Sequence, residues 1–144
     1  MKFWALLTIS LAAVLLMSGA GSPSATYVSH DKVAAAISKG GNLVTAPDLI
    51  VLGSHRDVAG KVEVLEKETD VMYVVEGTAT FVTGGTMVGG KMTKPGQLLG
   101  NDIQGGETHQ LSKGDVVVIP AGVPHWFKEI PGSINYYVVK VLKP

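Results

Sequence analysis

The chain of 144 residues contains no cysteine. This absence excludes a disulfide framework, thiol chemistry and zinc sites built on cysteine, so the fold must depend on a buried core. The charges are balanced at 12 basic and 12 acidic residues, which gives no electrostatic reason to expect nucleic acid or an anionic membrane surface as a partner. The sequence also has no G-x-S-x-G, P-loop, H-E-x-x-H or dinucleotide-binding fingerprint. These absences exclude several classes of function without yet indicating one.

Long apolar runs are also missing, except for one at the N-terminus that extends from Phe3 to Met17. Lys2 precedes this run and small residues follow it, which is the layout of a secretory signal peptide. The run is short for a membrane span, which needs roughly 20 apolar residues. We therefore predict a signal peptide over residues 1–20, cleaved after Ala20 or Ser24, and a protein exported to the periplasm or the medium without a stable membrane anchor. An uncleaved N-terminal anchor is the alternative.

Beyond this leader, the sequence predicts one short helix followed by many short strands. Ser29 can cap a helix over residues 30–39, which two glycines then end. Apolar runs of strand length then alternate with Gly, Pro, Asn and Asp, and no segment is long enough for the helix of a βαβ crossover. We therefore predict an all-β domain over residues 46–144, a small antiparallel β-barrel or jelly roll, preceded by a segment over residues 21–45 that carries the helix.

The segment GDVVVIPAGVPH resembles a motif of the cupin superfamily. In it, Gly114, Pro120, Gly122 and His125 have the spacing G-x5-P-x-G-x2-H of the second cupin motif. Glu129 stands where the family's motif usually ends in Asn. The resemblance, which extends over about residues 46 to 143, implies a barrel in which the strand after the Pro-Gly turn brings His125 into the interior.

The segment KVEVLEKETDVMYVVEG, which ends at Gly77, resembles the first cupin motif. Six residues separate Asp70 from Gly77, as in the family, but Glu63 and Leu65 stand where two histidines would be. In the other register of the motif, shifted by one residue, no histidine appears either. Cupin barrels typically hold a divalent transition metal with two or three histidines and one carboxylate. The resemblance implies Glu63, Asp70 and His125 as ligands for Mn, Fe, Ni, Cu or Zn, and this carboxylate-rich set leans toward Mn.

Strand alternation predicts which side chains line the interior around this site. Asp70 and Met72 share one face of their strand, as His125 and Phe127 share one face of theirs. In the interior, Asp70 needs a partner because a buried unpaired carboxylate is costly, and either His125 or a metal would be that partner. The predicted pocket is lined by Leu65, Met72, Phe127 and His109.

The remaining polar side chains have less specific interpretations. Glu66 and Glu68 lie in a mixed-charge turn, where side chains are most often exposed to solvent. His55 and His109 could each act as an additional metal ligand, although a single histidine is more often a surface or structural residue.

The sequence as a whole predicts an exported single-domain cupin with a small-molecule pocket and a weak or altered divalent metal site. Its function remains open between three alternatives, because cupins host many chemistries. The first is a metal-dependent enzyme of the dioxygenase or isomerase type, with catalytic residues unknown. The second is a binding module that has lost its metal because Leu65 replaces a histidine. The third is an assembly module, such as a homodimer, that forms contacts through outer aromatic residues such as Tyr73 and Trp126.

Overall fold

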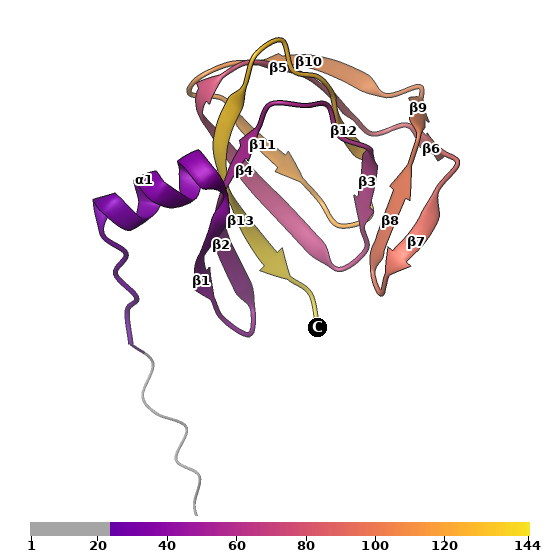
Figure 1. Ribbon diagram of the computed structural model, residues 1–144. Coiled ribbons are helices and arrows are strands. Elements are labelled where there is room, and N and C mark those ends of the chain that lie inside the picture. The colour runs from indigo at the N-terminus through magenta and orange to yellow at the C-terminus, as the bar shows by residue number, and fades with distance from the viewer. Residues whose placement is uncertain (1–23) are drawn as a thin grey trace, which may run out of the picture.

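The computed structural model describes residues 24–144, which form one helix and thirteen β-strands (Figure 1). The predicted signal peptide, residues 1–20, lies outside the described residues. Helix α1, His30–Lys39, begins and ends where the sequence predicts. Within residues 24–144, no helix is long and apolar enough to cross a membrane. The strands are β1 Gly41–Thr45, β2 Leu49–Arg56, β3 Val62–Leu65, β4 Glu68–Gly77, β5 Ala79–Thr83, β6 Thr86–Val88, β7 Lys91–Lys94, β8 Gln97–Gly100, β9 Asp102–Gln104, β10 Glu107–Leu111, β11 Val116–Ile119, β12 His125–Glu129 and β13 Ile134–Leu142.

Two antiparallel sheets carry the fold. The five-stranded sheet has the order β1-β2-β13-β4-β11, and the six-stranded sheet has the order β10-β5-β12-β3-β8-β7. Strands β6 and β9 form a separate pair. Among the described residues, no strand pairing joins the two larger sheets, so they are not closed into a barrel. The predicted antiparallel jelly roll is confirmed in this open, two-sheet form.

Strand β13 lies at the centre of the five-stranded sheet, between β2 and β4 (Figure 1). Its alternate residues Ile134, Tyr136 and Val138 are buried, as period-2 alternation requires for a strand with one face on the core. In register, Lys140 lies opposite Asp70 of β4 on one side and opposite Ile50 of β2 on the other. The same inward face therefore carries a charged residue at its C-terminal end.

Helix α1 packs outside the five-stranded sheet, against β2 (Figure 1). The contact is close because Gly53 of β2 has no side chain. A Cβ atom there would lie 2.4 Å from the carbonyl carbon of Ala36, which is shorter than any normal contact. Gly53 thus sets how near the helix comes to the sheet.

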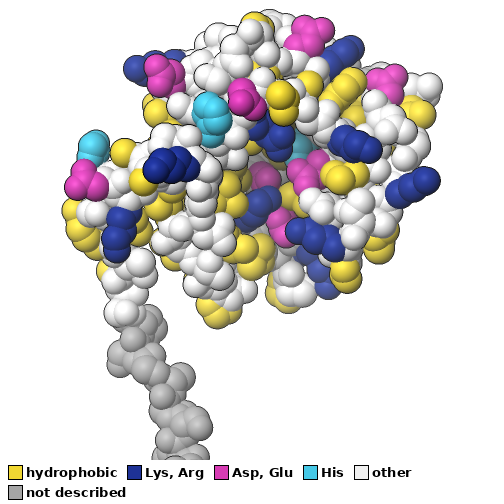
Figure 2. Space-filling view, in the orientation of Figure 1, with side chains coloured by type: hydrophobic (Ala, Val, Ile, Leu, Met, Phe, Trp, Pro, Cys, Tyr) yellow, Lys and Arg dark blue, Asp and Glu magenta, His cyan; other side chains and the backbone are white. Residues whose placement is uncertain are grey.

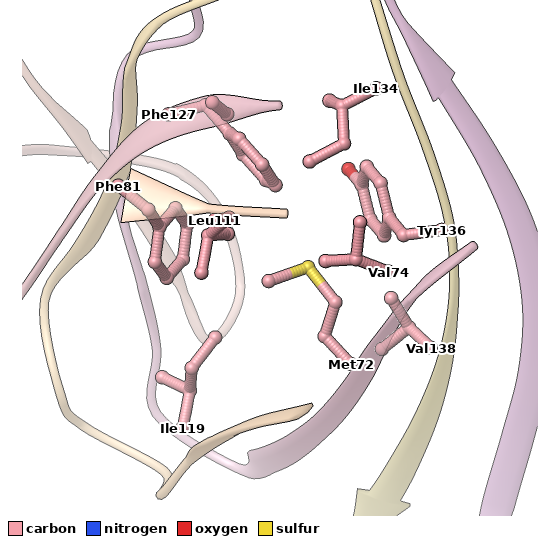
Figure 3. Close-up of a cluster of buried hydrophobic side chains, with 10 residues drawn as sticks. Met72, Val74, Phe81, Leu111, Ile119, Phe127, Ile134, Tyr136 and Val138 are labelled. Carbon is pink, nitrogen blue, oxygen red and sulfur yellow. The ribbon is translucent and has the colours of Figure 1, made fainter. Parts of the chain in front are cut away.

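The hydrophobic core fills the space between the inner faces of the two sheets (Figure 3). Phe81 of β5 is fully buried, with its ring centroid 4.7 Å from that of Phe127, which in turn stacks on Tyr136 at 5.1 Å. The sulfur of Met72 points into the middle of this cluster. The alternation that predicts Met72 and Phe127 in the interior is confirmed.

Candidate functional site

A cavity of about 310 Å³ opens at one end of this core and is lined by both sheets. Figure 2 shows a hollow in which basic, acidic and histidine side chains gather. Its walls combine apolar side chains with an unusual number of charges for a pocket, since small-molecule sites are mostly apolar with a few polar groups. The Lys, Arg, His, Asp and Glu residues that line the cavity are Arg56, Lys61, Glu63, Glu68, Asp70, Lys94, His125 and Lys140.

Lys140 forms ion pairs with two carboxylates at one end of the cavity. Its Nζ lies 2.9 and 3.0 Å from the two oxygens of Asp70 and 3.0 Å from Oε2 of Glu68. Only 19% of the Lys140 side chain and 10% of the Asp70 side chain are exposed. The buried partner that Asp70 needs is therefore a lysine.

Burial has opposite effects on the pKa values of Asp70 and Lys140. Burial raises the pKa of Asp70, and Lys140 only partly offsets this effect. Burial lowers the pKa of Lys140, but the carboxylates of Asp70 and Glu68 outweigh it and raise that pKa above its ordinary value. Lys140 is therefore a stable cation at neutral pH and is not suited to act as an amine nucleophile.

Glu63 and His125 form a second pair, in the six-stranded sheet. The two residues lie opposite each other in β3 and β12, and Oε2 of Glu63 is 3.4 Å from Nε2 of His125. The ring's Nδ1 lies 3.2 Å from the carbonyl oxygen of Val123, and Gln97 donates a hydrogen bond to Glu63. Because the carbonyl and the carboxylate are both acceptors, the His125 ring can donate to both only in its protonated form.

We expect the Glu63–His125 pair to make stability depend on pH. Burial raises the pKa of Glu63, but the hydrogen bonds from His125 and Gln97 and the charge of His125 outweigh it, and the pKa falls from 4.5 to about 2. A carboxylate with a lowered pKa in the folded state stabilises the fold above its unfolded pKa, and this contribution is lost as the pH falls from 4.5 toward 2. In urea unfolding, the free energy of unfolding of the wild type should fall more between pH 5 and pH 3 than that of Glu63→Gln. Equal losses in the two proteins would contradict this assignment.

The structure brings most of the predicted site residues to one cavity. Glu63, Asp70 and His125 line it, as do Leu65, Met72 and Phe127. His109 does not line it: this residue lies on edge strand β10, and its Nε2 is 3.0 Å from Oγ1 of Thr83. His55 lies at the surface, with its Nδ1 2.6 Å from Oδ1 of Asn135.

The prediction that Glu68 is exposed to solvent is wrong. Strand β4 begins at Glu68 itself, so Glu68 shares the inward face of Asp70 two residues later and binds Lys140. Glu66 is exposed, as predicted.

The sequence interpretation missed the four cationic residues that line the cavity, and two of them, Lys140 and Arg56, lie in phase with the inward-facing residues of their strands. Lys140 could have been recognised as a single lysine within the apolar strand INYYVVKVL. It follows Tyr136 and Val138 at two-residue spacing, and both of these side chains face inward. Arg56 ends the run LIVLGSHR, in phase with Leu52. Period-2 alternation marks both residues as inward-facing.

The predicted ligands Glu63, Asp70 and His125 do not form a site that fits a transition metal. Among residues 24–144, no group of three or more His, Asp or Glu side chains is arranged to hold a metal ion. Asp70 is bound to Lys140, and the aliphatic Leu65 lies at the position of a histidine ligand. Transition metals in proteins need several N, O or S donors that converge on one point, and here a buried ammonium lies among the carboxylates.

Comparisons with known proteins agree on the fold. Residues 63–141 match the family model described as "Cupin", and a search of curated proteins found no match. Among solved structures, BH2720 of Bacillus halodurans superposes with a TM-score of 0.53 and 15% identity, covering 72% of this chain and 69% of that one. The Cnp3 cupin domain of Schizosaccharomyces pombe gives 0.52 and 12%, covering 72% and 59%. The structure named FeII HppE gives 0.51 and 19%, covering 69% and 48%. The chain thus spans about half to seven tenths of these proteins, and identities this low show the fold alone.

Proposed function

This chain belongs to the cupin family, and we propose that it is an exported cupin that binds a small molecule in its cavity without a metal. The observation that carries the proposal is the position of Lys140. Its ammonium forms ion pairs with Asp70 and Glu68 from within the site, where the family resemblance implies a metal cation.

Electrostatic repulsion explains why Lys140 and a metal would exclude each other. Lys140 Nζ lies 2.9 Å from an oxygen of Asp70, and a metal on that carboxylate would lie roughly 2 Å from its oxygen. A divalent ion about 5 Å from the ammonium would be repelled by roughly 7 kcal/mol at an effective dielectric constant of 20. A metal-dependent dioxygenase or isomerase at this site would therefore require Lys140 to leave it.

Metal content tests this proposal. Wild-type protein purified without chelators should carry less than a tenth of an equivalent of any transition metal, and Mn, Fe or Zn should not change its melting temperature. The double variant Leu65→His/Lys140→Met replaces the missing imidazole and removes the ammonium, so it should bind Zn and melt about 5–10 °C higher at saturating metal.

The matched control for that variant is Val64→His/Lys140→Met. Val64 precedes Leu65 on β3, so alternation directs its side chain to the opposite face. The control should show no metal-dependent shift. One equivalent of metal in the wild type, or equal behaviour of the two double variants, would overturn the proposal.

Export and self-association belong to the same proposal. The leader over residues 1–20 supports export, and N-terminal sequencing of the exported protein should begin at Gly21 or Ala25.

The outer face of the five-stranded sheet supports a homodimer, because Val116 and Val118 of edge strand β11 are 60% and 58% exposed beside the Tyr73–Tyr137 pair. Light scattering should give twice the monomer mass, and a monomer would contradict the dimer.

A further inference from the structure

Arg56 is the only arginine in the chain, and it lies at the cavity with its side chain held in place. Its Nε donates a hydrogen bond to the hydroxyl of Tyr136 at 2.8 Å. Its Cζ lies 5.0 Å from the centroid of the Phe127 ring, a cation–π distance. The two contacts fix the guanidinium at the end of β2, so its orientation does not depend on a ligand.

The guanidinium has hydrogen-bonding capacity that the protein does not use. Of its five N–H groups, the described residues accept a hydrogen bond from Nε alone. Among residues 24–144, no carboxylate lies within 4.0 Å of it, although the other inward cation, Lys140, has two. Gly60 lies so close that a Cβ atom there would be 3.2 Å from Nη1, so the missing side chain leaves room for the guanidinium.

The strand register gives the order of the groups that a ligand would meet beyond Arg56. Alternate residues of β2 line the cavity, and each of them lies opposite a residue of β13. From the Arg56 end, the polar pair Ser54–Tyr136 comes first and the apolar pair Leu52–Val138 second. Successive pairs are about 6.6 Å apart along the strands. The cavity thus passes from an arginine through hydroxyl groups to an apolar stretch, beyond which the pair Ile50–Lys140 carries the ion-paired ammonium.

From this order we infer that Arg56 binds the carboxylate of a small organic acid whose apolar body lies along Leu52 and Val138. A guanidinium presents paired N–H groups that match the two oxygens of a carboxylate, and such charge-assisted bonds are about twice as strong as neutral ones. The inference rests on the proposed small-molecule role and adds the chemical class of the ligand.

Hexanoate and its neutral isostere hexanamide test the ligand class on the wild-type protein. Because the chain has one arginine, its Nε–Hε group gives a single signal in a ¹⁵N spectrum, which reports binding at Arg56 directly. Hexanoate should shift this signal and bind at least tenfold more tightly than hexanamide, while hexylamine should leave the signal unmoved. Equal affinities for acid and amide, or binding of the amine alone, would overturn the inference.

Variants separate the role of Arg56 from general attraction of anions. Arg56→Gln should remove the preference for hexanoate over hexanamide, and Arg56→Lys should retain part of it. Lys61→Gln, which removes a more exposed cation of the same cavity, should keep the preference. Loss of preference in Lys61→Gln but not in Arg56→Gln would refute the assignment. A metal found in the cavity would refute the proposed function and leave this result unaffected, so the two failures are distinguishable.

Discussion

Replacing Lys140 with methionine is expected to lower the free energy of unfolding by about 3 kcal/mol at pH 7, because breaking a buried ion pair leaves its partners uncompensated. Asp70 and Glu68 would then lie together without a cation in a site where the Asp70 side chain is 10% exposed. The methionine keeps the length of the side chain, so the loss reports the charge and not the packing. Urea unfolding followed by the fluorescence of Trp126, the one tryptophan among the described residues, measures it.

The pH dependence of this loss identifies its source. Burial raises the pKa of Asp70 even beside Lys140, and without Lys140 the pKa should rise further. A carboxyl with a raised folded-state pKa destabilises the fold when it is ionised, so the deficit of Lys140→Met should shrink as the pH falls toward 4. The control Lys113→Met changes an exposed lysine and should alter stability by less than about 0.5 kcal/mol. A deficit independent of pH would show that the charges are not its cause.

Phe81→Ala should have the larger effect, a loss of about 4 kcal/mol, as for other large-to-small changes of fully buried aromatic residues. Phe81 is 0% exposed, and its ring centroid lies 4.7 Å from that of Phe127 and 6.2 Å from that of His125. The ring therefore supports both the core and the histidine of the site. Urea unfolding measures the loss.

A surface valine provides the comparison for Phe81. Val118→Ala on β11 removes an apolar side chain that is 58% exposed, so the monomeric protein at low concentration should lose less than about 0.5 kcal/mol. If Phe81→Ala cost less than 1 kcal/mol, Phe81 would not be part of a packed core.

Local sequence patterns predicted the fold and the inner face of the site because both depend on short spacings. The Pro-Gly turn before His125 and the alternation at Asp70 and Met72 each act over a few residues, and burial of all three confirms them. The prediction that Glu68 lies in a turn failed because β4 already begins at Glu68, and strand boundaries decide which side chains face inward.

The partner of Asp70 could not be predicted in the same way. Lys140 is 70 residues away along the chain, and the two meet only through the register between β4 and β13. A lone lysine in an apolar strand is compatible with an exposed position or a buried one, and tertiary pairing decides between them. The same holds for Arg56, whose neighbours Tyr136 and Phe127 come from two other strands.

The central position of β13 also constrains when the protein can fold during its synthesis. It is the last of the described strands along the chain, yet it lies between β2 and β4, which have no pairing with each other. Until the ribosome has released residues 134–142, these two strands lack their common neighbour, and Asp70 lacks its cation. Non-local strand pairing of this kind is slow to form, so we expect the five-stranded sheet to be completed only after β13 has emerged.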